Sequence, residues 1–433
     1  MQFTEDQILA LAPDEASKKA GKDLSTPSKW VSKGMNEKAI WGECQGSGSK
    51  PYQTQVDIVS LAFKCSCPSR KFPCKHGLGL LLFNARQTAA FTDNTPPTWV
   101  AEWLAKRIEK TEKKAEQANK PVDEEAQQKR LQAREQLIED GISELLLWLQ
   151  DIVRKGIIHL PQNGSAAFDN MAKRMVDAKA PGIANLVKSL GRINFYKEGW
   201  EGQFLQQVTR IYLAIAAFKN RNEPKRLYDA DIKTQIGFTQ NQEALKEQGG
   251  IEDNWLVIGK QTTEEDNITT ERNWLYGCNS KQYALVLQFS VRGQGITFTL
   301  TPGMCIQAEL VFFPSLVPLR AIIKKQIASH VTTIPEGLPN WLAVTDVLAT
   351  QKITLPFATI SPLIVEYLLP IQVNNEWYLQ DAMQAIMPIE QADTTIWKLL
   401  AISGGQPLRM ALLSQQHQFL PIGVWSNNTY ISL

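Results

Sequence analysis

The chain contains the stretch Cys65-Ser66-Cys67-Pro68-Ser69-Arg70-Lys71-Phe72-Pro73-Cys74-Lys75-His76, which places three thiols and one imidazole within twelve positions. A tetrahedral zinc ion takes four ligands of these types. The whole chain of 433 residues has only six cysteines and four histidines. We therefore predict that Cys65, Cys67, Cys74 and His76 bind one Zn²⁺ ion. Because the protein supplies all four ligands, the expected site is structural and leaves no position for a catalytic water.

Three other interpretations of the cysteines are weaker. Unrelated buried cysteines rarely cluster so closely, and the spacing CxC is not the CxxC of dithiol exchange. Cys44 is near the stretch and is a minor candidate for a further ligand. Cys278 and Cys305 are expected to be buried core thiols, and His159, His330 and His417 are expected to pack or to face solvent.

The residues around the ligands predict a small β-β-metal-α unit within residues 1–100. Two short strands are expected over Tyr52–Ile58 and Val59–Lys64, and an apolar helix over Gly77–Arg86. An opening helix is expected from Thr4 to about Lys19. The zinc ligands would then lie where the second strand ends and the helix begins.

The rest of the chain divides by pattern into three further parts. Residues 101–135 are rich in both charges and predict a solvated helical linker, because no sustained heptad supports a coiled coil. Residues 136–226 have helical periodicity and predict a helical domain. Residues 227–433 alternate as strands do and predict an α+β domain with a mainly antiparallel sheet. Within that domain we expect hairpins over 283–300 and 397–413, and helical segments over 341–350 and 377–387. The predicted fold class is α+β, multidomain.

The runs CSCPSRKFPCKHGLGLLL and WGECQGSGSKPYQTQVDI resemble the bacterial SWIM zinc-finger proteins over roughly residues 40–90. The resemblance implies a ββα finger with Cys65, Cys67, Cys74 and His76 as zinc ligands. It also implies a module that binds DNA or proteins and has no chemistry of its own. Since bacterial SWIM proteins often occur alongside AAA-type ATPases and von Willebrand A-type proteins, the resemblance suggests partners of those classes.

A basic patch accompanies the ligands. From Leu61 to Ala90 there are five basic residues and no acidic one. One interpretation is that Lys64, Arg70, Lys71 and Lys75 contact DNA phosphates. The other is that these cations balance a zinc cluster whose three thiolates give it a net negative charge. The sequence leaves both open.

Composition and motifs limit the remaining functions. The net charge of +2 implies no nucleic-acid or acidic partner by itself. The segment Gly42–Lys50 lacks the spacing of a phosphate loop, and no hydrolase or dinucleotide motif occurs. No segment is apolar and long enough for a signal peptide or a membrane span, so we expect a cytoplasmic protein without a membrane partner. No small-molecule substrate is evident. The leading expectation is a non-enzymatic adaptor, the alternative is a DNA-binding protein, and an enzyme with its site in the C-terminal domain ranks third.

Overall fold

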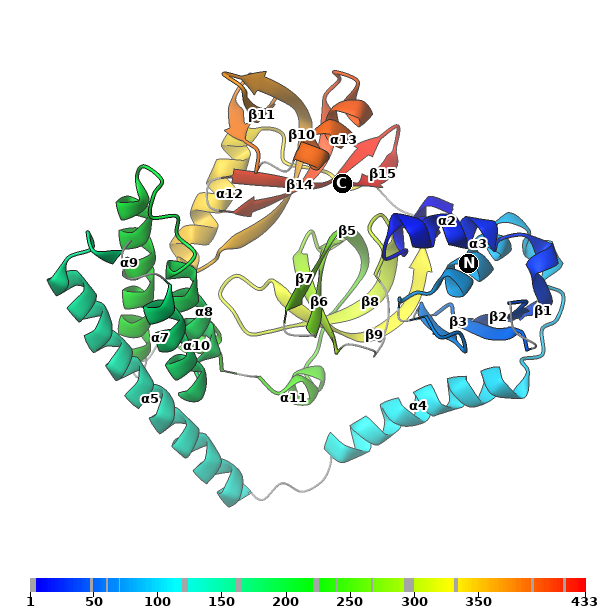
Figure 1. Ribbon diagram of the computed structural model, residues 1–433, viewed down its shortest axis with the longest axis horizontal. Coiled ribbons are helices and arrows are strands. Elements are labelled where there is room, and N and C mark those ends of the chain that lie inside the picture. The colour runs from blue at the N-terminus through cyan, green and yellow to red at the C-terminus, as the bar shows by residue number, and fades with distance from the viewer. Residues whose placement is uncertain are drawn as a thin grey trace.

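The structure is a computed structural model that describes residues 5–46, 50–59, 61–69, 71–118, 124–160, 165–220, 226–238, 240–265, 268–291, 300–330, 334–390, 393–415 and 418–433. Figure 1 shows an N-terminal unit, a helical bundle, a central β-barrel and a C-terminal sheet. The expected fold class, an α+β chain with a central helical region, is confirmed.

The N-terminal unit is a four-stranded antiparallel sheet covered by helices, and is larger than the predicted ββα finger. The predicted opening helix is wrong as a single element. It is two helices, because the chain turns at Pro13 and the Asp14 carboxylate caps a new helix by accepting from the Ser17 amide. The elements are α1 (Glu5–Ala10), α2 (Glu15–Asp23), β1 (Trp30–Met35), β2 (Ala39–Cys44), β3 (Tyr52–Asp57), β4 (Ala62–Cys65) and α3 (Lys75–Arg86).

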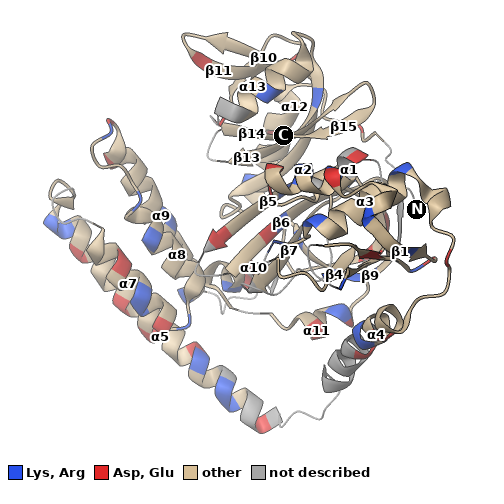
Figure 2. Cartoon of the chain, turned by 45° about the vertical axis from the view of Figure 1, so that its right-hand side comes forward, with Lys and Arg blue, Asp and Glu red and all other residues tan. Residues whose placement is uncertain are grey.

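Two long helices connect this unit to the bundle. They are α4 (Thr98–Ala118) and α5 (Glu124–Lys155), and the predicted border between linker and helical domain at 135/136 falls inside α5. Residues of both charges occur along α5 (Figure 2). The mixed charge suits an exposed helix, while the C-terminal half of α5 turns Ile138, Ile142 and Leu145 into the bundle core.

The bundle surrounds one apolar core. Its other helices are α7 (Ala166–Asp177), α8 (Pro181–Leu190), α9 (Trp200–Lys219) and α10 (Arg226–Ile236). Ile232 and Ile236 of α10 belong to the same buried cluster as Phe204 of α9 and Ile183 of α8. The helical region therefore continues to Ile236, beyond the predicted border at 226.

Residues 251–330 close into a barrel with the order β5-β6-β7-β9-β8. Four neighbouring pairs are antiparallel, and β7 and β9 are parallel. This strand order is that of an OB-fold barrel. The strands are β5 (Ile251–Glu265), β6 (Ile268–Gly277), β7 (Tyr283–Val291), β8 (Cys305–Phe312) and β9 (Arg320–His330), preceded by the short helix α11 (Gln242–Lys246). The second strand of the hairpin expected over 283–300 lies mostly outside the described residues.

The C-terminal unit is a six-stranded sheet with the order β12-β11-β10-β13-β14-β15. The helix predicted near 341–350 is present as α12 (Trp341–Thr354). The sheet strands are β10 (Ile360–Val373), β11 (Glu376–Gln380), β12 (Ile386–Pro388), β13 (Leu408–Gln415), β14 (Gln418–Ser426) and β15 (Thr429–Ser432), and the second helix is α13 (Asp393–Ser403).

Two sequence predictions in this unit are wrong. Residues 377–387 form β11, a turn and β12 rather than a helix, because Asn374 and Asn375 adopt the left-handed turn conformation that folds β11 back on β10. Residues 397–403 belong to a helix rather than a strand. Ile396 and Leu399 are buried three positions apart while Trp397 is exposed, which is helical spacing.

The barrel holds the other units together. The Gln326 side chain donates a 3.1 Å hydrogen bond to the carbonyl of Val59, in the β3–β4 turn of the N-terminal unit. Met304 of the barrel also belongs to the apolar cluster that contains Ile58 and Leu61. In a second contact, the Tyr430 hydroxyl of β15 donates to the carbonyl of Ile258 in β5. The N-terminal unit and the C-terminal sheet therefore both dock on the barrel.

Candidate metal centre

The four predicted ligands converge on one point. Cys65 is the last residue of β4, Cys67 lies in the turn that follows, Cys74 is the residue that caps α3, and His76 lies in its first turn. One donor atom from each residue lies within 4.8 Å of the other three. The Cys65 Sγ and His76 Nδ1 atoms are 3.7 Å apart. Zinc–ligand bonds of about 2.0–2.3 Å in a tetrahedron need donor separations of this order. The cluster is thus positioned to bind one zinc ion.

The three sulfur atoms are close enough to share protons. The hydrogen bond from the Cys74 thiol lowers the pKa of Cys65 to about 4, with further help from His76 and Thr54. The same contact raises the pKa of Cys74, because a second thiolate beside the first is unfavourable. Three thiols therefore cannot all ionise at neutral pH without a cation. A zinc ion supplies that cation, and its binding would release the remaining thiol protons.

Neighbouring side chains orient the ligands. The Thr54 hydroxyl lies 3.2 Å from the Cys65 sulfur, and the Tyr52 ring packs on His76 with 4.9 Å between ring centroids. Both residues lie on β3 and were not predicted as part of the site. No local motif marks them, because their place depends on the pairing of β3 with β4.

The site has the character of a structural metal centre. Cys74 and His76 are buried, and the helix that follows them is buried along Leu78–Asn84. Cys44 lies outside the ligand group: its sulfur contacts its neighbour's carbonyl, and burial raises its thiol pKa to about 11. Within the described residues, no other group of three or more metal-binding side chains gathers in this way. Cys305 is buried and Cys278 is half-buried.

The structure describes three of the four residues of the predicted basic patch. Lys64, Lys71 and Lys75 are exposed, and the Lys71 ammonium also lies 2.6 Å from the carboxylate of Asp14. Arg70 lies outside the described residues. The sequence window 61–90 contains no acid, so the partner of Lys71 could be found only from the fold. Contact of these residues with nucleic acid stays a prediction.

This closed Cys₃His cluster, at the junction of a strand and a helix, defines a zinc-finger protein. Comparison with known families gives a more specific assignment: residues 56–84 match the SWIM zinc finger, and residues 133–236 match the SWIM-associated four-helix bundle domain. The chain therefore contains a SWIM zinc finger and the helical bundle domain that is associated with it. The second match begins inside α5 and ends at the last residue of α10, which agrees with the extent of the buried bundle core. No curated protein and no solved structure matches the chain.

None of the described helices combines the length and the apolar character that a crossing of the bilayer needs.

Proposed function

We propose that this SWIM protein is a non-enzymatic adaptor, in which zinc stabilises the N-terminal unit and the other units present surfaces for protein partners. The observation that carries the proposal is the closed ligand set. Four protein side chains gather their donor atoms at one point, so a bound zinc ion would have its four ligands from the protein, a role in folding and no open position for a substrate.

Exposed apolar side chains support an interaction role. On α9, Leu205, Tyr212 and Leu213 are each about half exposed, while Phe204 and Ile211 of the same helix are buried. Side chains of this size on the solvent face of a helix favour a protein partner. These apolar side chains are not buried in the core of the bundle and are available to a partner.

The C-terminal unit offers a second surface. Trp397 of α13 and Leu342 of α12 are each about two-thirds exposed. Residues 341–433 contain twice as many acids as bases, which disfavours nucleic acid there. An AAA-type ATPase or a von Willebrand A-type protein, the classes suggested by the SWIM resemblance, forms part of this proposal.

Affinity purification of the tagged chain from its native host tests the adaptor role. The zinc-loaded protein should retain a partner in a fixed ratio, and Tyr212→Asp with Leu213→Asp, or Trp397→Asp, should release it. Tyr196→Asp, on the most exposed tyrosine of the bundle, is the matched control. A chain that retains no partner, or one whose partner ignores all these substitutions, would refute the proposal.

DNA binding is the alternative, favoured by the exposed Lys64, Lys71 and Lys75. The adaptor proposal expects no charge-dependent binding to duplex or single-stranded DNA at low salt. Binding that falls in Lys64→Glu/Lys75→Glu and in Arg70→Glu/Lys71→Glu, yet persists in the control Lys129→Glu on α5, would favour the alternative instead.

A further inference from the structure

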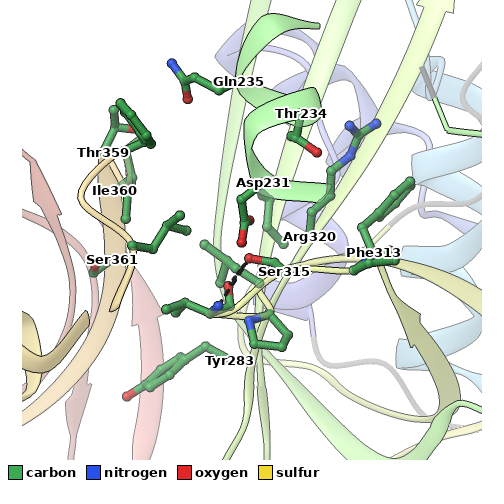
Figure 3. Close-up of a pocket in the computed structure, with 18 of the residues that line it drawn as sticks. Asp231, Thr234, Gln235, Tyr283, Phe313, Ser315, Arg320, Thr359, Ile360 and Ser361 are labelled. Atoms are coloured by element: carbon green, nitrogen blue, oxygen red, sulfur yellow. Dashed lines mark hydrogen bonds between the residues drawn. The ribbon is translucent and has the colours of Figure 1, made fainter. Parts of the chain in front are cut away.

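A pocket of about 520 Å³ lies where the bundle, the barrel and the C-terminal unit meet. Asp231, Thr234 and Gln235 of α10 form one wall, and Thr359, Ile360 and Ser361 at the start of β10 form the facing wall (Figure 3). The barrel closes the pocket with its β6–β7 face and with the segment that leads into β9. A volume of this size is typical of sites for small organic ligands.

One cation on the wall has no ionic partner. Arg320 is half-buried, and its guanidinium carbon lies 4.4 Å from the centroid of the Phe313 ring. Burial alone lowers the pKa of Arg320, and no carboxylate pairs with it in the part of the chain that the structure describes. Stacking on a ring holds the guanidinium in place while its N–H groups stay available, an arrangement suited to a carboxylate or a phosphate.

Further positive charge lies behind the facing wall. Arg210 of α9 donates a 2.8 Å hydrogen bond to the carbonyl of Phe357, and Lys352 of α12 donates to the carbonyl of Ala358. Both carbonyls belong to a loop that lines the pocket. Asp231, the one carboxylate among the lining residues, already accepts a hydrogen bond from the Leu316 amide. The charges around the pocket therefore favour an anion.

A buried donor on the pocket lacks an acceptor. Trp274 is 1% exposed and lines the pocket, and its indole Nε1 has no hydrogen-bond partner among the residues that the structure describes. A buried N–H without an acceptor costs about 1–3 kcal/mol. The other aromatic residues on the lining are Phe238, Tyr283, Phe313 and Phe357, which provide flat apolar surface.

We propose that this pocket binds a small organic anion with a planar body, of the size and chemistry of a mononucleotide. Arg320 would bind the anionic group, the Trp274 indole would donate to a ligand acceptor, and the aromatic residues would contact the planar body. The ligand would touch α10, the barrel and β10 together, so its binding would fix the three units relative to one another. This site is separate from the zinc cluster and from the surfaces proposed for protein partners.

Calorimetric titration of the zinc-loaded full-length chain tests the proposal, with adenosine 5′-monophosphate as the probe. We expect a dissociation constant below about 1 mM. Adenosine, which lacks the anion, and inorganic phosphate, which lacks the planar body, should each bind at least about tenfold more weakly. Hydrogen exchange should slow in residues 313–320 and 355–362 when the nucleotide is added.

Variants assign the binding to the pocket. Arg320→Met should weaken nucleotide binding by about tenfold to a hundredfold, and Trp274→Phe by about twofold to tenfold. Arg272→Met is the matched control, since Arg272 lies on the same barrel and is absent from the lining. Thr359→Trp, which fills the pocket from an exposed position, should abolish binding without removing a core residue. Melting curves verify that each variant is folded.

Three results would overturn the proposal. The first is no nucleotide binding below about 1 mM by the folded protein. The second is equal binding by the parent chain and by folded Arg320→Met and Thr359→Trp variants. The third is adenosine or phosphate binding as tightly as the nucleotide.

Discussion

The ammonium group of Lys71 lies 2.6 Å from the carboxylate of Asp14. This ion pair joins the zinc-binding loop to the residue that caps the N-terminus of α2. Asp14 accepts from Ser17 at the same time. The pair connects two segments that the sequence separates by the whole four-stranded sheet.

This pair predicts a pH dependence. The hydrogen bond from Lys71, with that from Ser17, lowers the pKa of Asp14 to about 2. Since an aspartate in an unfolded chain has a pKa of about 3.9, the pair stabilises the fold above roughly pH 4 and loses its effect as the pH falls towards 2. The melting temperature of Lys71→Met should lie below that of the parent at pH 6, and the difference should shrink below about pH 4. Zinc release at low pH affects both proteins, so the difference between them is the quantity to measure. A difference in melting temperature that is constant from pH 6 to pH 3 would contradict a stabilising role of this ion pair.

The zinc cluster predicts that substitutions of two cysteines will differ in their effect on bound zinc. Cys74→Ser removes a ligand and should reduce bound zinc from one ion per chain to near zero, as measured by elemental analysis. Because structural zinc contributes about 10–16 kcal/mol in small finger peptides, amide exchange should accelerate across β4 and α3. Cys44→Ser, at a buried thiol outside the cluster, should keep its zinc. Zinc retained by Cys74→Ser would exclude that residue as a ligand.

The contact between β15 and the barrel predicts a loss of stability. The Tyr430 hydroxyl donates a 2.5 Å hydrogen bond to the Ile258 carbonyl, and Gly423 leaves room for the Tyr430 ring. Tyr430→Phe should lower the free energy of unfolding by about 1–2 kcal/mol, because the carbonyl loses its donor in a buried place. Tyr196→Phe, at a side chain that is 89% exposed, should change it little. Equal effects in denaturant titrations of the two variants would argue against the contact.

The contact between α9 and the loop before β10 predicts a local effect. Arg210→Met should lower the free energy of unfolding by about 1–3 kcal/mol and speed amide exchange in residues 355–358, since the Phe357 carbonyl loses a charged donor. Arg154→Met removes an arginine whose ion pair on α5 is exposed, and should be nearly neutral. Unchanged exchange in that loop would show that Arg210 does not hold it.

The sequence predicted the metal ligands because they are local. Cys65, Cys67, Cys74 and His76 lie within one short stretch, and ligand type and spacing suffice to identify them. The bundle helices were also predictable, because Leu137 to Val153 repeats apolar residues at the helical period. Elements of this kind carry their signal within a single segment.

The arrangement of strands was not predictable in the same way. The barrel closes by pairing β5 with β8, which are far apart in the chain, and no local pattern specifies that pairing. The run Trp397-Lys398-Leu399-Leu400-Ala401-Ile402 suits either a strand or a helix by periodicity, and packing of Leu399 decides for the helix. The ion pair between Lys71 and Asp14 likewise forms only when distant segments of the chain meet. The same holds for the pocket between the bundle, the barrel and the C-terminal unit.

The hydrogen bond from Gln326 to Val59 spans 267 positions of the chain. A ribosome adds about 5–20 residues per second, so roughly 13–55 s separate the synthesis of the two partners. During that interval the finger is exposed without Met304 and without the barrel surface that later covers its β3–β4 turn. A metal ion captured by the nascent chain is the one strong cross-link that all four ligands can form at once, since they emerge together. Bound zinc would thus keep the N-terminal unit folded during synthesis, until the barrel on which it docks has been made.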